Sequence, residues 1–196
     1  MSHKLGLTGS IGMGKSTTAQ MFRDAGVPVW DADETVHQLY AKGGAAVPKI
    51  AAIFPQAIID GAVSRPALRE VIKDDLAALA RIEEIVHPLV SKSRDAFTRI
   101  NDDPLIVFDI PLLFETKADA WLDSVVVVSV PPDVQRARVM MRGDMDEKTF
   151  EFILSRQMPD AEKQQSADHH IETLSIHETR AAVAALITKL SKVPHA

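Results

Sequence analysis

The chain of 196 residues contains no cysteine, one tyrosine and two tryptophans. Without cysteine it forms no disulfide and no thiolate metal site, which suits a reducing compartment. It also lacks an excess of positive charge, since its net charge is −5, so no basic field indicates a nucleic-acid partner. No apolar run approaches the roughly 18 residues of a membrane span, and no signal segment precedes the first predicted strand. We therefore expect a cytoplasmic protein with no nucleic-acid, membrane or obligate protein partner.

Three of the nine glycines fall in one short segment, residues 9–16, which reads Gly-Ser-Ile-Gly-Met-Gly-Lys-Ser. It fits the phosphate-binding P-loop pattern G-x-x-x-x-G-K-[ST]. Apolar residues 4–7 before it predict a short buried strand, and residues 17–22 after it predict a helix, which is the context that the motif needs. A chance glycine-rich turn is the alternative. The dinucleotide-binding pattern G-x-G-x-x-G is not met, because no glycine stands three residues after Gly14.

The P-loop pattern assigns a phosphate-binding role to each part of the segment. The predicted ATP-binding residues are Gly9, Ser10, Ile11, Gly12, Met13, Gly14, Lys15, Ser16 and Thr17. The glycines let backbone N–H groups approach a phosphate, and the positive end of the following helix dipole favours the same anion. Lys15 can reach the β- and γ-phosphates, and the hydroxyl of Ser16 can join the shell of a Mg²⁺ ion.

Two acidic residues follow predicted strands, which is where open α/β sheets place their ligand-binding sites. Asp33 closes the run Asp-Ala-Asp after a strand at residues 27–30, in which Pro28 indicates an edge strand or the first residues of a strand. Capping of the next helix is the alternative for Asp33. Asp109 ends the apolar run 104–108, which predicts a central buried parallel strand, and it can serve the metal. A helix cap or a satisfied buried carboxylate is the alternative for Asp109.

From about residue 41 to residue 101 the apolar spacing is helical, and no strand pattern interrupts it convincingly. This predicts a helical insertion after the second strand, forming a lobe over the site. It contains Arg65, which by itself suggests a solvated surface charge. It also contains His87 and Pro88, which by themselves suggest an interrupted helix.

The second half of the chain predicts two further strands and a lid. Residues 110–115 form an apolar run with an early proline and with Glu115 at its end. Such a run is typical of a loop or short helix that covers a binding site. Strand 124–130 precedes a helix on which Arg138 and Arg142 share a face. Arginines on a mobile flap can clamp a transferring phosphate, whereas a solvated basic face is the alternative. A second helix at about 147–166 would complete the lid, before a last strand at 168–171 and a terminal helix.

These motifs together resemble one family, dephospho-CoA kinase, in order and spacing over nearly the whole chain. The segments that carry the likeness are Gly6-Leu7-Thr8-Gly9-Ser10-Ile11-Gly12-Met13-Gly14-Lys15-Ser16, Asp31-Ala32-Asp33, His87-Pro88, Asp109-Ile110-Pro111-Leu112-Leu113-Phe114-Glu115, Arg138 with Arg142, Gln157-Met158-Pro159 with Glu162-Lys163, and Ala167-Asp168. The P-loop alone is generic. The Asp-Ala-Asp and Pro-Leu-Leu-Phe-Glu runs make the resemblance specific.

The resemblance implies ATP-dependent phosphorylation of the ribose 3′-hydroxyl of dephospho-CoA, which gives CoA and ADP. It implies an α/β P-loop kinase fold, in which a five-stranded parallel sheet carries helices on both faces. The expected parts are a nucleotide-binding core (residues 1–33, 102–134 and 167–196), a helical CoA-substrate lobe (34–101) and a lid (135–166).

The resemblance also implies which side chains act. The catalytic set is Asp33 as candidate base, Lys15, Arg138 and Arg142. The substrate-binding set is Asp33, Arg65, His87, Leu112 and Glu115, and the metal set is Ser16 and Asp109, with Mg²⁺ accompanying ATP.

The sequence departs from the family pattern at three places. Met13 stands where the family usually has serine, and its backbone can still bind phosphate. Ile153 stands where the family often has an arginine of the lid, with Arg156 nearby. Thr173 follows Ile171-Glu172 where the family commonly has Ile-Asp-Asn, so the family's contacts to the nucleotide base do not carry over directly.

Two other readings stay open. The first is another P-loop small-molecule kinase, such as a nucleoside monophosphate kinase, which the Pro-Leu-Leu-Phe-Glu run and the large insertion disfavour. The second is a non-catalytic nucleotide-dependent switch. A GTPase switch would usually show Asn-Lys-x-Asp, but the single asparagine, Asn101, is followed by Asp102.

Overall fold

The computed structural model describes residues 2–75, 77–143 and 145–192, and the chain divides into two compact units. The first unit comprises the described residues up to Trp30 and from Asn101 onward, and the second is Asp31–Ile100. Within the described residues, no helix is both long and apolar enough to cross a membrane.

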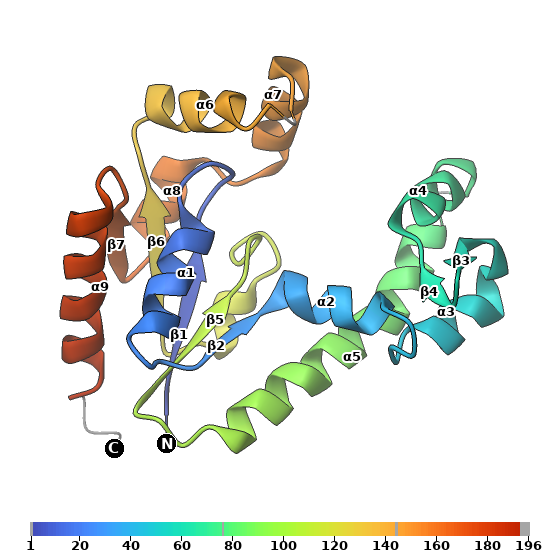
Figure 1. Cartoon of the computed structure of the whole chain (residues 1–196), viewed down its shortest axis with the longest axis horizontal. Helices are drawn as coiled ribbons and strands as arrows, with labels where there is room; N and C mark the ends of the chain where they lie inside the picture. The colour runs from blue at the N-terminus through green and yellow to red at the C-terminus, as the bar shows by residue number, and fades with distance from the viewer. Residues whose placement is uncertain (1, 76, 144, 193–196) are drawn as a thin grey trace. The chain divides into compact units, whose positions relative to one another are not determined.

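Five strands form the main sheet, in the spatial order β2-β5-β1-β6-β7 (Figure 1). They are β1 (His3–Thr8), β2 (Val29–Asp31), β5 (Leu105–Asp109), β6 (Ser124–Ser129) and β7 (His169–Glu172). Leu5 of β1 pairs in parallel with Val107 on one side and Ser124 on the other. The sheet confirms the predicted parallel α/β fold, and β2 lies at its edge, as Pro28 indicated.

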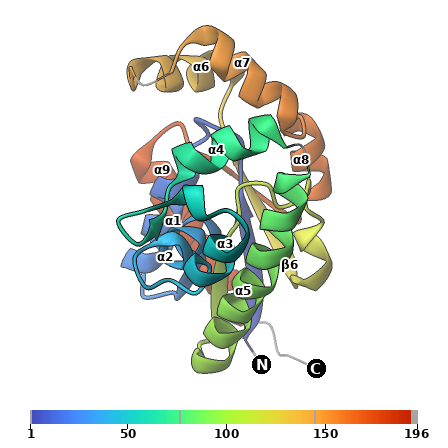
Figure 2. The ribbon, with the colours of Figure 1, turned by 90° about the vertical axis from the view of Figure 1, so that its right-hand side faces the viewer.

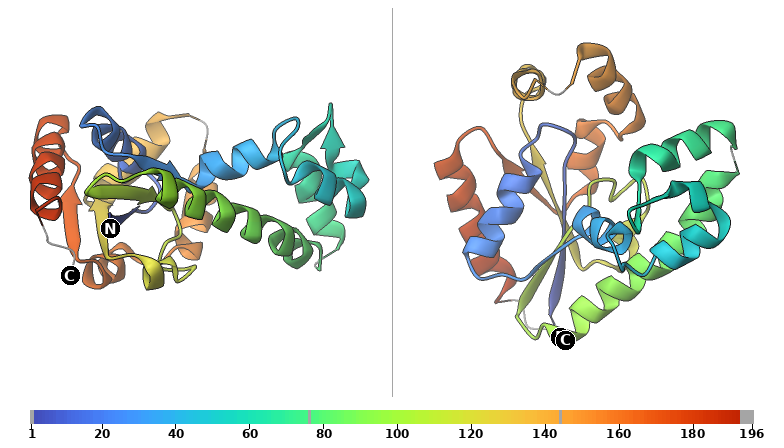
Figure 3. Two further views of the ribbon diagram at one scale, coloured as in Figure 1. Left: turned by 90° about the horizontal axis from the view of Figure 1, so that it is seen from below. Right: turned by 45° about the vertical axis from the view of Figure 1, so that its right-hand side comes forward.

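Helices cover both faces of this sheet (Figure 3). Helices α1 (Lys15–Asp24) and α9 (Ile176–Leu190) contact each other on one face, and α8 (Asp160–Ser166) packs against β6 on the other. The core between α1, α9 and the sheet is built from buried aliphatic side chains together with Met13, Met21 and Phe22. On the opposite side of β5, Phe108 meets Trp121, in the 3-10 helix η2 (Ala118–Trp121), edge-on at 4.9 Å between ring centroids.

The predicted single helix at residues 147–166 is wrong. The chain forms α6 (Pro132–Met141), then α7 (Glu147–Arg156), and only then α8. Between α7 and α8, Gln157 and Pro159 have extended backbone, with ψ of 147° and 141°. Pro159 lacks an N–H group and disfavours helical backbone in the residue before it, which ends the helix there.

The second unit is mainly helical (Figure 2). Its elements are α2 (Ala32–Tyr40), α3 (Val47–Ile53), the 3-10 helix η1 (Pro55–Ala57), β3 (Ile58–Ile59), β4 (Ala62–Val63), α4 (Arg65–Asp74) and α5 (Ala78–Ile100). Helices α2, α3 and α4 each contact α5. The expectation of an insertion without strands is wrong, because β3 and β4 form a short antiparallel hairpin. Its turn, Asp60-Gly61, has positive φ at both residues, as two-residue hairpin turns require.

The expected helix interruption at His87 and Pro88 is also absent. Helix α5 is 23 residues long and contains Pro88 in its interior without a break. Its buried positions, Ala78, Ile82 and Val86, recur every four residues along one face, so packing of that face holds the helix together. His87 and Pro88 themselves are exposed.

Pro88→Ala is expected to raise the free energy of unfolding by about 1–3 kcal/mol, because proline in a helix interior removes a backbone hydrogen bond. Urea unfolding of the whole chain measures this. Lys92→Ala, at an exposed position of the same helix, is the control and should stay within about 0.5 kcal/mol of the wild type. A less stable Pro88→Ala variant would show that the proline imposes a backbone shape that the lobe needs.

Candidate active site

The P-loop connects β1 to α1 and leaves the start of that helix open to an anion. Gly12 and Gly14 have φ of 79° and 87°, a region that other residues rarely adopt. Gly14 is the N-cap of α1 without a side-chain cap, and the first turn carries no acidic residue. Ser16 and Thr17 lie exposed in that turn. The unbonded N–H groups and the helix dipole therefore favour a bound phosphate.

Lys15 forms an ion pair with Asp109, whose Oδ1 lies 2.6 Å from the lysine Nζ. The Asp109 side chain is 2% exposed at the end of β5, and Lys15 is 16% exposed. The pair compensates the burial of the carboxylate and fixes the ammonium beside the P-loop.

Asp109 and Ser16 offer the hard oxygen ligands that Mg²⁺ prefers. Among the described residues, no group of three or more histidine, aspartate or glutamate side chains could hold a metal by itself. This fits Mg²⁺, which is usually bound through one or two protein ligands together with substrate phosphates and water.

A pocket of about 320 Å³ lies beside the P-loop in the first unit. Its lining includes Gly12, Gly14 and Thr17 together with Arg138 and Arg142. The fold thus brings both predicted lid arginines to the predicted phosphate site. Such a pocket can take a nucleotide, because its lining combines hydrogen-bond donors with apolar surface from Met141 and Ile176.

Arg138 is held in place, whereas Arg142 is exposed at the C-cap of α6. The Arg138 guanidinium donates through Nη2 to the carbonyl oxygen of Thr173 at 2.6 Å, and through Nη1 to its Oγ1 at 3.1 Å. The alternative that this arginine only forms part of a solvated basic helix face therefore does not hold for Arg138.

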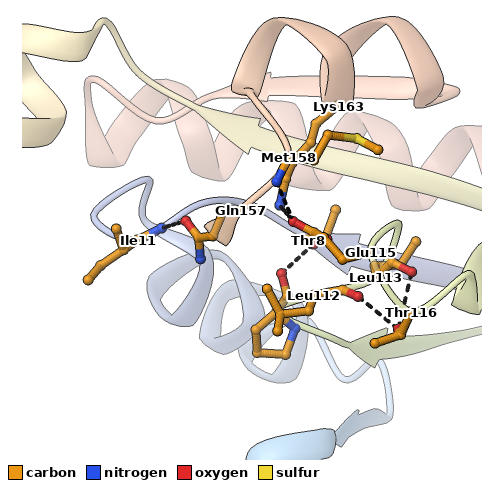
Figure 4. Close-up of polar contacts among 10 residues, drawn as sticks. Thr8, Ile11, Leu112, Leu113, Glu115, Thr116, Gln157, Met158 and Lys163 are labelled. Carbon is orange, nitrogen blue, oxygen red and sulfur yellow. Dashed lines mark hydrogen bonds and ion pairs between the residues drawn. The ribbon is translucent and has the colours of Figure 1, made fainter. Parts of the chain in front are cut away.

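Glu115 is bound to the segment between α7 and α8 (Figure 4). Its Oε1 accepts a hydrogen bond from the N–H of Met158 at 2.8 Å and lies 2.9 Å from the Nζ of Lys163, a fully buried lysine of α8. Burial alone would raise the pKa of Glu115, but the hydrogen bonds from Lys163 and Met158 outweigh it and lower that pKa. Leu112, in the same loop, is 42% exposed.

The same segment also reaches the P-loop. Gln157 accepts a hydrogen bond from the N–H of Ile11 through Oε1 at 3.2 Å (Figure 4). On the other side of Ile11, its carbonyl accepts from Nε2 of Gln135 in α6 at 2.7 Å. Gln135 belongs to no motif and could not be singled out from the sequence, whereas Gln157 belongs to the Gln-Met-Pro run.

Asp33, Arg65 and His87 belong to the second unit and are exposed. The cap of α2 is Asp31, which accepts from the N–H of Glu34 at 2.9 Å, so capping does not account for Asp33. Arg65 is the first residue of α4 and lies close enough to Tyr40 to lower its pKa in part, although burial raises that pKa overall.

The fold and this site define the chain as a P-loop kinase. The family model for dephospho-CoA kinase matches residues 3–178, and the chain belongs to the dephospho-CoA kinase family.

Relatives and solved structures agree with this assignment. The chain is 58% identical to dephospho-CoA kinase of Jannaschia sp. (strain CCS1), covering 98% of this chain and 99% of that one. It is 53% identical to that of Ruegeria pomeroyi, covering 97% and 96%. The crystal structure of a Thermus thermophilus protein matches with a TM-score of 0.83 at 29% identity, over 99% of both chains.

Glu115→Gln is expected to lower the free energy of unfolding by about 3 kcal/mol, because it leaves the buried Lys163 ammonium without a counter-charge. Denaturant unfolding at pH 7 measures this. The double variant Glu115→Gln/Lys163→Met should recover most of the loss, since it removes both charges. No recovery would show that the ion pair is not the cause.

The same pair makes stability depend on pH. Because the folded-state pKa of Glu115 is lowered, its contribution is complete above the unfolded-state pKa and is lost as the pH falls through the folded-state pKa. The difference between wild type and Glu115→Gln should therefore shrink from pH 7 to about pH 3. A difference that stays constant over this range would contradict the assignment.

Proposed function

We propose that this protein transfers the γ-phosphoryl group of ATP to the ribose 3′-hydroxyl of dephospho-CoA, giving CoA and ADP, the last step of coenzyme A synthesis. One observation carries the proposal: Gly12, Gly14 and Thr17 of the P-loop line a pocket together with Arg138 and Arg142, in a chain of the dephospho-CoA kinase family. The work of such an enzyme is positioning and charge stabilisation.

The nucleotide end of the site consists of the P-loop and the lid. Backbone N–H groups of the P-loop at residues 9–17, other than those of Ile11 and Met13, bind the phosphates together with the ammonium of Lys15. Ser16 and Asp109 would hold Mg²⁺, which when bound neutralises charge that develops on the phosphates. Residues 135–166 act as the lid, and Arg138 and Arg142 bind the γ-phosphate and exclude water that would otherwise hydrolyse ATP.

The acceptor end is the lobe at residues 34–101. Asp33 accepts a hydrogen bond from the attacking 3′-hydroxyl and orients it, and Arg65 and His87 bind the CoA portion. Leu112 completes the acceptor site, together with Glu115, whose bonds to Met158 and Lys163 fix the loop that carries both residues. A cytoplasmic location is part of this proposal, and the cysteine-free composition is compatible with it.

The first experiment measures ADP release from ATP and Mg²⁺ with and without dephospho-CoA, and the product by mass. We expect turnover only with dephospho-CoA and a product one phosphate heavier. Turnover with a nucleoside monophosphate instead would overturn the proposal in favour of another small-molecule kinase. Nucleotide binding without any transfer would favour a non-catalytic switch.

Asp33→Asn is expected to lower kcat by about 10²–10⁴-fold, the usual scale for a general base, with little change in KM for ATP. Glu34→Gln, which changes the neighbouring exposed acid of α2, is the matched control and should keep near-normal turnover. Steady-state assays of both variants measure this. Near-normal kcat in Asp33→Asn would remove Asp33 from its role.

A further inference from the structure

Two side chains from outside the P-loop hold two of its carbonyl groups. Nε2 of Gln135 donates to the carbonyl oxygen of Ile11 at 2.7 Å. The hydroxyl of Thr173 donates to the carbonyl oxygen of Met13 at 2.8 Å. Gln135 is 5% exposed and Thr173 is 7% exposed, so neither bond competes with much water.

The geometry of the peptide bond carries these contacts to the other side of the loop. The chain has no cis peptide bond among the described residues, and a planar trans peptide points its C=O and N–H in opposite directions. Holding the carbonyl of Ile11 therefore turns the N–H of Gly12 away from Gln135. Holding the carbonyl of Met13 likewise turns the N–H of Gly14 away from Thr173.

These two amides remain available to a ligand. Within the described part of the chain, no acceptor is bonded to the N–H of Gly12 or of Gly14. The preceding carbonyls are the bonded partners instead, so each peptide is fixed from one side and open on the other.

The two glycines also leave no space behind the loop. A Cβ on Gly12 would lie 2.7 Å from Cγ2 of Val139 and 3.1 Å from the backbone oxygen of Gln135. A Cβ on Gly14 would lie 2.8 Å from the hydroxyl of Thr173. Gln135 and Thr173 are thus each packed directly against the glycine whose amide they orient.

We propose that Gln135 and Thr173 are positioning residues, which orient the amides of Gly12 and Gly14 toward a bound polyphosphate through the peptides of the loop. The proposal rests on the proposed function only in that the P-loop binds the phosphates of a nucleotide. The hydroxyl of Thr173 also accepts from Arg138, so one hydroxyl joins the P-loop to a lid arginine.

The test compares isosteric and conservative variants in direct binding. Gln135→Met and Thr173→Val remove the donor to the P-loop carbonyl and keep the volume of the side chain. Thr173→Ser keeps the hydroxyl. Calorimetry measures the affinity of each protein for ADP, for inorganic pyrophosphate, which only a phosphate site recognises, and for adenosine.

We expect Gln135→Met and Thr173→Val each to weaken ADP and pyrophosphate binding by about 3- to 10-fold, the effect of one net hydrogen bond. Adenosine binding should stay unchanged, and Thr173→Ser should stay within about twofold of the wild type. Thr188→Val is the control, because it removes a similar bond, from Thr188 to the carbonyl of Ala184, on the exposed face of α9.

Unchanged pyrophosphate affinity in both variants would overturn the proposal. So would an equal loss of adenosine binding, which would place the effect in the pocket for the base. Thr173→Val retains the bond from Arg138 to the backbone carbonyl of Thr173, and Gln135→Met removes no bond of Arg138, so agreement between the two variants excludes an effect through Arg138 alone. Wild-type protein that binds ADP without phosphorylating dephospho-CoA would contradict the proposed function and leave this test decisive.

Discussion

The Lys15–Asp109 pair is the constraint on which the active unit depends. A carboxylate with 2% exposure in the middle of a sheet costs several kcal/mol unless a cation compensates it. Asp109 ends β5, and Lys15 opens α1, so the pair forms only if β1 and β5 are neighbours and the P-loop returns over them. The same topology leaves the N-terminus of α1 facing the carboxyl end of the sheet, where α/β proteins bind phosphate.

The backbone of the P-loop also forms hydrogen bonds with side chains from segments far apart in the chain. Gln135 in α6, Gln157 after α7 and Thr173 after β7 each bond to its backbone. Gln135 and Gln157 both lie in the proposed lid, so two of these bonds join the lid to the P-loop. Glu115 binds Met158 and the buried Lys163, which belong to the same part of the chain.

Long apolar runs predicted the sheet well, since a strand buried on both faces needs hydrophobic residues throughout, as in β5 and β6. Short sequence patterns predicted the structure less well where tertiary packing determined the secondary structure. Pro88 suggested an interruption, but burial of one face carries α5 through it. The β3–β4 hairpin has only two residues in each strand, too few for a visible alternation.

By itself, the sequence determined the phosphate-binding segment, the strands of the main sheet and the family, because these depend on residue types at short, fixed spacings. Only the tertiary structure showed that Glu115 binds Lys163 and Met158, and that Gln135 and Thr173 hold the P-loop from behind. Those contacts join residues 43 to 160 positions apart. No local pattern encodes them, since the packing of helices on the sheet decides which distant polar groups become partners.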